Sequence, residues 1–211
     1  MELVRYFRHE LDALGVNIRC GVTVTGQLLQ AQAFDMTLLA TGSRPVIPRF
    51  AAELPNMTTA EHILLEAIKP GHRVLIIGGG MIGCELADSL GERGHAVTIL
   101  EMRPEVAQDM EWRARHTLMP RLERYGVTLL TGMEVMETAN TGRNRIRDAY
   151  GVEEWLEPFD TTAISVGYRP EKMLARELEH MRLPYKGIGD CVAPGKILDA
   201  MHQGLAAAYA L

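Results

Sequence analysis

Residues 72–101 read HRVLIIGGGMIGCELADSLGERGHAVTILE, and this stretch decides the fold. Its first apolar run is typical of a buried parallel strand and leads directly into a glycine loop of the form G-x-G-x-x-G. Apolar residues at helical spacing follow, Gly94 suits a helix C-cap, and a second apolar run ends in Glu101. The pattern predicts a strand, a helix and a second parallel strand, as in a doubly wound α/β sheet.

The glycines of this loop have the spacing that a bound dinucleotide requires. Gly78 allows the tight turn after the strand, and Gly80 lets the backbone approach a pyrophosphate without an intervening Cβ. Gly83 lets the helix pack closely on the strand, and the helix N-terminus offers free N–H groups to the phosphates. The sequence therefore predicts a Rossmann-like NAD(P)-binding domain that contacts the cofactor through Gly78, Gly79, Gly80, Met81, Ile82 and Gly83. The alternative is a glycine-rich structural turn.

Three charged residues near the loop are candidates for contacts with the cofactor, and two of them bear on the choice between NAD(H) and NADP(H). Glu101, at the tip of the second strand, is placed to accept both ribose hydroxyls of an adenosine, which favours NAD(H) because a 2′-phosphate would meet its negative charge. Arg103 would instead contact that phosphate, so NADP(H) stays open. Glu85, in the first turn of the helix, either faces the nicotinamide pocket or stabilises the helix dipole.

Composition and charge exclude several classes of protein. The 211 residues are 47% hydrophobic and 23% charged, which are ordinary globular values. A net charge of −5 without any basic run argues against a nucleic acid partner. No stretch approaches the roughly 18 apolar residues of a membrane span, and the first residues lack the apolar core of a signal peptide. We therefore expect a cytoplasmic protein with no membrane partner.

The cysteines and histidines do not form a recognisable site. Cys20, Cys84 and Cys191 lie far apart and form no C-x-x-C pair, which argues against a disulfide framework and a local thiol redox motif. The seven histidines are scattered and show no zinc-ligand spacing. No metal site is predicted, and no catalytic residue can be assigned from the sequence.

The rest of the chain alternates between helical and strand patterns. Helices are expected over residues 2–14, about 110–125, and about 197 to the end of the sequence. Strands are expected at residues 16–20, 36–40, 127–131, 133–137, 144–149 and 159–166, with a weak strand before Gly189.

Part of the sequence repeats. The pattern Phe34-Asp35-x-Thr37-x4-Gly42-x-Arg44-Pro45 recurs at residues 159–170 with an offset of 125, and positions within residues 11–24 recur within 122–135 with an offset of 111. Two matches in the same order indicate a duplication. The first copy lacks a counterpart of the glycine loop, which would fall before Met1. We therefore expect the chain to be a piece of a longer protein.

The sequence also resembles a known family. The segments GGGMIGCELA, LLATGSRP, AISVGYRP and IGDC resemble the pyridine-nucleotide-linked flavoprotein oxidoreductases that have two dinucleotide-binding domains. The longer segments TAEHILLEAIKPGHRVLIIGGGMIGCELA and IGDCVAPGKILDAMHQG are most similar to the C-terminal FAD/NAD(P)-binding region of the 2,4-dienoyl-CoA reductase, enoate reductase and trimethylamine dehydrogenase group. The resemblance implies an NAD(P)H-binding domain at residues 70–170, inserted in a partial FAD-binding domain of the same type at residues 1–69 and 171–211.

The resemblance also implies site residues. The family's strand-ending A-T-G lies near the flavin nucleotide and corresponds to Ala40, Thr41 and Gly42, while Val166 and Gly167 in the second copy would lie near the nicotinamide. The family's G-D pair corresponds to Gly189 and Asp190, with the aspartate on the flavin ribityl chain. The alternatives are a strand-ending turn at Thr41-Gly42 and a helix N-cap at Asp190.

The implied activity is an NAD(P)H-dependent flavoprotein oxidoreductase. Hydride would pass from nicotinamide to FAD, and electrons onward to an FMN and iron–sulfur barrel in the remainder of the parent flavoenzyme. The FAD-domain glycine fingerprint is absent from this sequence, so FAD is expected in the full-length parent, and a homodimer through exposed FAD-side strand edges is a further expectation. The alternatives are a non-catalytic nucleotide-binding or redox-sensing module, and a reductase of a ferredoxin or small-molecule acceptor.

Overall fold

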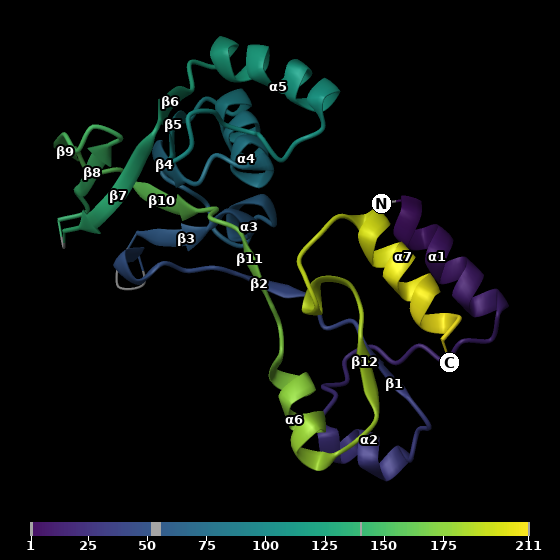
Figure 1. Cartoon of the computed structure of the whole chain (residues 1–211). Coiled ribbons are helices and arrows are strands. Elements are labelled where there is room, and N and C mark those ends of the chain that lie inside the picture. Colours follow the sequence, from purple (N-terminus) through teal and green to yellow (C-terminus); the bar gives the residue numbers. More distant parts are fainter. Residues whose placement is uncertain (1, 52–55, 140, 211) are drawn as a thin grey trace.

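A computed structural model describes residues 2–51, 56–139 and 141–210 and shows two lobes joined by a narrow connection (Figure 1). The connection is a two-stranded antiparallel ribbon of β2 (Ser43–Pro45) and β11 (Tyr168–Pro170), in which Arg44 is paired with Arg169. Each strand of the ribbon carries the chain from one lobe to the other. The repeated segments found in the sequence are therefore in contact with each other.

The larger lobe contains the parallel sheet that the glycine-loop stretch predicts. Its strand order is β3-β10-β4-β5-β6, and every neighbouring pair is parallel. The strands are β3 (Met57–Thr59), β4 (Arg73–Ile77), β5 (Ala96–Glu101), β6 (Thr128–Thr131) and β10 (Thr161–Ile164). From β4 the sheet extends through β5 to β6 on one side, and the later strand β10 returns to the other side of β4, between β4 and β3, so the order reverses between β4 and β10. Ligands of doubly wound sheets bind at such a switch point, beyond the carboxyl ends of the strands.

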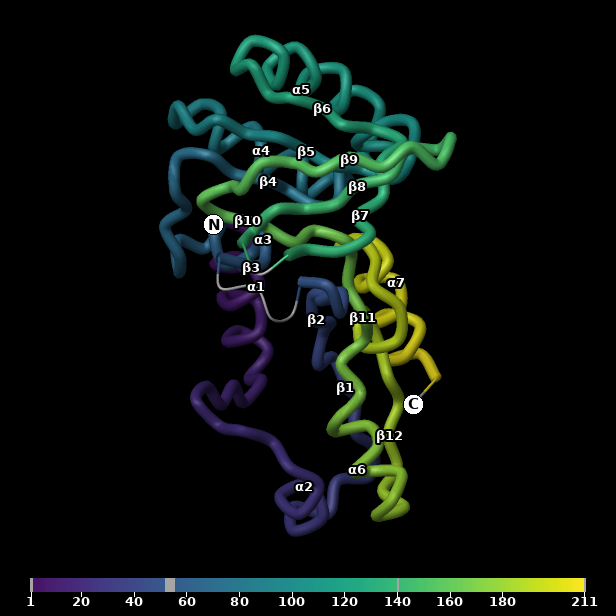
Figure 2. Tube along the Cα trace, turned by 90° about the vertical axis from the view of Figure 1, so that its left-hand side faces the viewer, coloured from purple at the N-terminus to yellow at the C-terminus, as the bar shows by residue number. Residues whose placement is uncertain are grey.

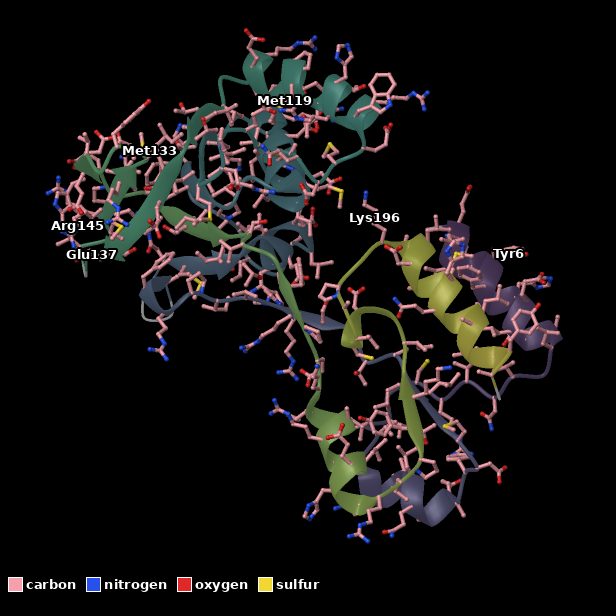
Figure 3. The ribbon with its side chains drawn as sticks, viewed as in Figure 1. Tyr6, Met119, Met133, Glu137, Arg145 and Lys196 are labelled. Carbon is pink, nitrogen blue, oxygen red and sulfur yellow. The ribbon has the colours of Figure 1, made fainter. Side chains whose placement is uncertain are left out.

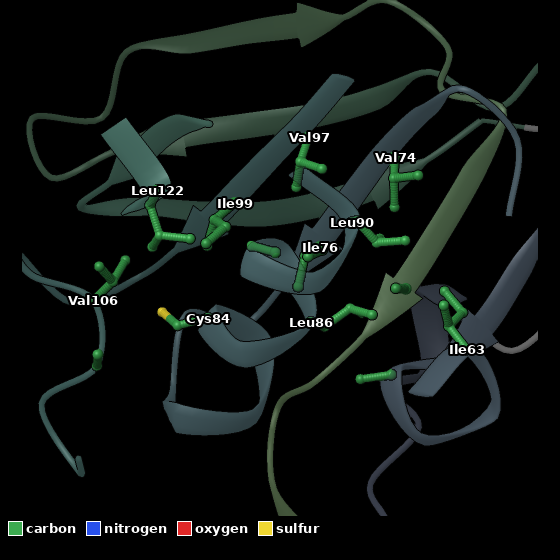
Figure 4. Close-up of a cluster of buried hydrophobic side chains, with 14 of the residues drawn as sticks. Ile63, Val74, Ile76, Cys84, Leu86, Leu90, Val97, Ile99, Val106 and Leu122 are labelled. Carbon is green, nitrogen blue, oxygen red and sulfur yellow. The ribbon is translucent and has the colours of Figure 1, made fainter. Parts of the chain in front are cut away.

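The sheet is covered on both faces because its strands alternate buried residues between the two sides. Val74, Ile76 and Ile99 face one side, where they pack with Leu86 and Leu90 of α4 (Met81–Glu92) (Figure 4). On the same side lie α3 (Ala60–Leu64) and α5 (Trp112–Arg124), which contact α4. The other face packs on a three-stranded antiparallel sheet of β7 (Met133–Thr138), β8 (Asn144–Asp148) and β9 (Glu153–Leu156).

The smaller lobe is built around two parallel strands, β1 (Thr37–Leu39) and β12 (Tyr185–Gly187). Leu39, Leu178 and Cys191 form its buried core, which is closed by α2 (Gly26–Gln32) and α6 (Met173–Met181). Short 3-10 turns occur at η1 (Arg49–Ala51) in the larger lobe and at η2 (Gly189–Cys191) in the smaller.

The terminal helices, α1 (Glu2–Ala13) and α7 (Ile197–Ala208), have largely exposed faces. None of the residues of α1 is buried, and the only buried residue of α7 is Ala207. The two helices overlap in Figure 1, but Figure 2 shows α1 well separated from α7. Throughout the described ranges, every helix is too short or too polar to cross a lipid bilayer.

Most of the expected elements are confirmed, including the α/β class and the parallel sheet. One expected strand is wrong: residues 16–20 are extended coil. Their repeat counterparts, residues 127–131, contain β6, which is hydrogen-bonded to β5. A strand needs a partner for its backbone N–H and C=O groups, and residues 16–20 are paired with none. The sheet also draws its edge strand β3 from upstream of residue 70, the expected domain boundary.

Candidate dinucleotide-binding site

One cavity brings together most of the residues predicted to bind NAD(P). It has a volume of about 540 Å³ and opens beyond the carboxyl ends of β4, β5 and β10. Its lining includes the predicted residues Gly78, Gly80, Met81, Ile82, Glu101, Arg103, Val166 and Gly167. Phe50, Met133 and Val135 contribute apolar side chains to the lining, and Figure 3 labels Met133 at the start of β7. A concave, mainly apolar cavity with a few converging polar groups is the usual form of a small-molecule site.

The glycine loop has the geometry that its spacing predicts. Gly78 has φ of +105°, a conformation that favours glycine, and a Cβ at this position would overlap the carbonyl oxygen of Ser165. Gly83 lies against the carbonyl oxygen of Gly78, so a Cβ there would separate the helix from the loop. A Cβ at Gly79 would lie 2.7 Å from Val106 Cγ1. These contacts hold the loop close to the strand, with the N-terminus of α4 facing the cavity.

Glu101 connects the end of β5 to the glycine loop. Its side chain is 5% exposed, and its Oε2 accepts the N–H of Gly79 at 2.6 Å. Its Oε1 accepts the backbone N–H of Arg103 at 2.9 Å and Nε of the same residue at 3.2 Å. Three donors thus occupy a carboxylate that has about four acceptor sites. Glu101 holds the loop in place and retains the capacity to accept from one further hydroxyl.

The N-terminus of α4 is capped by a residue that sequence reasoning missed. The backbone N–H of Met81 donates to Asp109 Oδ1 at 2.8 Å, and Asp109 lines the cavity. Asp109 lies 28 residues from Met81, on the connection between β5 and α5, and no local spacing links the two positions. Only the folding of that connection over the loop brings them together.

The second copy of the repeated segment forms the far wall of the cavity. The N–H of Ser165 donates to the carbonyl oxygen of Ile77 at 2.8 Å, which places Val166 and Gly167 beside Gly78. Tyr168 also lines this wall, and burial together with the Glu61 carboxylate raises its pKa above the ordinary value. Glu85, in contrast, is exposed on α4 and is absent from the cavity lining.

The residues expected near a flavin gather in the smaller lobe. The N–H of Ile188 donates to the carbonyl oxygen of Leu39 at 2.9 Å, so the segments after β1 and β12 lie side by side. Ser43 Oγ then donates to Asp190 Oδ2 at 3.0 Å, and the N–H of Gly195 donates to Asp190 Oδ1 at 3.1 Å. Ala40, Thr41 and Gly42 are thereby brought next to Gly189 and Asp190. The alternative role of Asp190 as the N-cap of the following helix is wrong, because Lys196 caps α7.

A second, wider groove runs along α5 and β6. It is lined by Trp112, His116, Met119, Leu129 and neighbouring residues, and it includes none of the predicted site residues. Within the described ranges, no three histidine, cysteine or acidic side chains are grouped to hold a metal ion.

Comparison with known proteins identifies the family of the chain. Residues 11–194 match the model of the pyridine nucleotide-disulphide oxidoreductase family. The chain belongs to this family.

Relatives of this family member are longer than the chain. It is 33% identical to an NADH oxidase of Thermoanaerobacter brockii, over 98% of the chain and 33% of the relative. It is 32% identical to a bilirubin reductase of Mediterraneibacter gnavus, over 99% of the chain and 32% of the relative. A solved structure of a 2-naphthoyl-CoA reductase superimposes with a TM-score of 0.86 at 26% identity, over 96% of the chain and 31% of that protein. The chain thus spans about a third of the length of these relatives.

The family name refers to disulphide chemistry, but the cysteines of this member are separated in space. Cys84 lies in the core of the larger lobe, and Cys191 lies in the core of the smaller. Burial raises the pKa of the Cys84 thiol to about 12, and Cys191 Sγ donates to the carbonyl oxygens of Leu39 and Ile188 at 3.0 and 3.1 Å. Cys20 is exposed.

We expect a thiol reagent at neutral pH to modify one cysteine rapidly in the native protein and all three after unfolding. The reactive species is an accessible thiolate: Cys84 and Cys191 are buried away from the reagent, and the raised pKa of Cys84 also disfavours its thiolate. Titration with Ellman's reagent measures the two amplitudes. The Cys20→Ser variant is the control and should lose the fast amplitude alone; a fast amplitude that survives in this variant would contradict the assignment.

Proposed function

We propose that this chain is the NAD(P)H-binding part of a flavin-dependent oxidoreductase. In the whole enzyme, electrons from the nucleotide would pass to FAD and onward to an FMN and iron–sulfur barrel domain that is not in this chain. The observation that carries the proposal is the cavity in which the glycine loop, Glu101 and the Val166-Gly167 segment meet at the switch point of the sheet. Names such as NADH oxidase and 2-naphthoyl-CoA reductase among the relatives support it.

The residues present fit a dinucleotide. The close contacts at Gly79 and Gly83 leave no space for side chains, while a Cβ at Gly80 would point into the cavity toward Asp109 Oδ2, 3.3 Å away. We propose that residues 78–83 hold the pyrophosphate and that Glu101 accepts from the adenosine ribose. Arg103 would lie at the same end, where its side chain is 44% exposed, and Val166 and Gly167 would hold the nicotinamide half.

A flavin would use the smaller lobe. Ala40, Thr41, Gly42, Gly189 and Asp190 lie together there, and the hydrogen bond from Ser43 to Asp190 fixes the arrangement. When bound, a nicotinamide supplies a hydride and a flavin accepts it. The residues of this chain bind and orient the two groups, and the substrate of the whole enzyme follows from the remainder of the protein.

The proposal predicts that the chain binds NADH more tightly than FAD, because its sequence contains one glycine fingerprint of the dinucleotide type. The Glu101→Ala variant should bind NADH about 1–2 kcal/mol more weakly, since it loses a charge-assisted hydrogen bond to the ribose and the anchor of Gly79. Calorimetric titration of NADH, NADPH and FAD measures these affinities.

The control for this variant is Glu105→Ala. Glu105 lies on the connection between β5 and α5, four residues after Glu101. Its side chain is 62% exposed in an ion pair with Arg115, so its removal should leave NADH binding unchanged. Thermal melting of each variant separates loss of binding from loss of fold. Stoichiometric FAD binding in preference to NADH would contradict the proposal, and tighter binding of NADPH than NADH would contradict the role of Glu101.

A further inference from the structure

We propose that Asp109 sets the affinity of the cavity for dinucleotides by competing with their pyrophosphate for the first amide of α4. The inference rests on the proposed function and adds a residue to it. Asp109 Oδ1 already accepts the N–H of Met81 at 2.8 Å. A phosphate bound at the N-terminus of this helix would use the same backbone donors. Asp109 is therefore an internal anion at the position that the ligand must occupy.

Asp109 is placed there by the connection between β5 and α5, which is held by hydrogen bonds and one buried side chain. The N–H of Ala107 donates to the carbonyl oxygen of Gly79 at 2.7 Å, and Val106 is 2% exposed against the glycine loop. Arg115 Nε donates to the carbonyl oxygen of Val106 at 3.1 Å, which fastens the connection to α5. Ala107 also has φ of +54°, a left-handed conformation that costs energy for a residue with a side chain. These contacts determine where the Asp109 carboxylate lies.

The charge of Asp109 is not neutralised by an ion pair within the described ranges. Arg103 contacts Glu101 and Arg115 contacts Glu105, while the guanidinium of Arg113 lies over the ring of Trp112. The positive end of the α4 dipole favours one anion at this position, whereas a pyrophosphate next to an ionised carboxylate experiences repulsion. Asp109 stabilises the free protein and disfavours the bound state.

Binding therefore requires the Asp109 side chain to leave the Met81 amide. The measured affinity is reduced by the fraction of molecules in which that amide is available. The side chain can move without unfolding the connection, because the anchors at Val106 and Ala107 are backbone and apolar contacts that do not involve the carboxylate. Asp109 is thus a residue that tunes ligand affinity and takes no part in the reaction.

The test is the affinity of the Asp109→Asn variant for NADH, measured by calorimetry on the full chain. The asparagine oxygen is a weaker acceptor than the carboxylate, so the substitution removes the negative charge and releases the Met81 amide more readily while keeping the size of the side chain. We expect NADH to bind about tenfold more tightly than to the wild-type chain, as a pair of like charges near a protein surface is worth at least this factor. Inorganic pyrophosphate as a second probe should show the same direction of change.

The matched control is Glu111→Gln. Glu111 Oε2 caps α5 by accepting the N–H groups of Arg113 at 2.9 Å and Ala114 at 3.2 Å, and Glu111 is absent from the cavity lining. The Glu111→Gln substitution removes one negative charge two residues from Asp109, and it should leave the NADH affinity within about twofold of the wild-type value. If the wild-type chain binds NADH and the Asp109→Asn variant binds it equally or more weakly, the role of Asp109 is overturned and the proposed function is not. If the wild-type protein and the Asp109→Asn variant are both folded and neither binds NADH, the proposed function is overturned as well.

Discussion

The Gly83→Ala variant should lose about 2–3 kcal/mol of unfolding free energy, although a single methyl group is added. Gly83 is buried in α4, and its added Cβ would overlap the carbonyl oxygen of Gly78 and come within 3.4 Å of Ile76 Cγ2. Both neighbours belong to the strand and loop at the centre of the sheet, so neither can move alone. Urea denaturation followed by circular dichroism measures the change.

The control for this variant is Gly204→Ala in α7, where an added Cβ meets nothing within 4 Å. Alanine is a better helix former than glycine, so this variant should be unchanged or more stable by up to about 1 kcal/mol. A Gly83→Ala protein as stable as wild type would show that the helix and loop are not in the contact that the structure places between them.

The Gly80→Val variant should bind NADH roughly 100-fold more weakly and still fold. Gly80 has φ of −70° and ψ of −175°, a backbone conformation that valine also adopts, and a Cβ there meets only the carboxylate of Asp109 at 3.3 Å or more. The cost of the substitution therefore arises when a pyrophosphate approaches the backbone and meets the two added methyl groups. Calorimetric titration with NADH and a thermal melting curve together measure the two outcomes.

Gly204→Val in the other lobe is the control for the added volume, and it should bind NADH as the wild type does. Gly80→Ala should lie between wild type and Gly80→Val. A folded Gly80→Val protein with unchanged NADH affinity would remove the phosphate-binding role of the loop.

The sequence alone predicts the central βαβ unit because every local signal in it agrees. The apolar run of β4, the glycine spacing, the helical spacing in α4 and the terminal Glu101 all require one arrangement. Where the local signal is the same but the surroundings differ, sequence reasoning fails. Residues 16–20 and 127–131 have the same repeat pattern, yet only the second segment forms a strand, because β5 is beside it.

The candidate site likewise contains residues that the sequence identifies and one that it does not. The meeting of the loop, Glu101 and the Val166-Gly167 segment around one cavity was predictable, since motif spacing identifies the first two and the family resemblance, together with the repeat, implies the third. Asp109 was not, because its contact with Met81 depends on how a connection folds back over the loop. The sequence places Glu85 in the first turn of its helix, which is wrong: α4 begins at Met81, its first turn contains no acidic residue, and Glu85 lies beyond that turn, exposed and outside the cavity lining.

The ribbon between the lobes has the geometry of a twofold axis. Arg44 pairs with Arg169, which is its own counterpart in the repeat because 44 + 125 = 169. At one end of the ribbon the N–H of Val46 donates to the carbonyl oxygen of Gly167 at 2.9 Å. At the other end the N–H of Glu171 donates to the carbonyl oxygen of Gly42 at 3.0 Å. In the repeat Glu171 corresponds to Val46 and Gly167 to Gly42, so the two hydrogen bonds are equivalent.

Such self-complementary pairing is the rule at the isologous interface of a symmetric dimer. The two strands of the ribbon thus pair as the matching strands of two identical subunits would, with a single polypeptide supplying both sides of the contact. Within the ribbon, Arg44 and Arg169 form the central pair, in which a residue faces its own counterpart, so a substitution at either position changes the same contact for both copies.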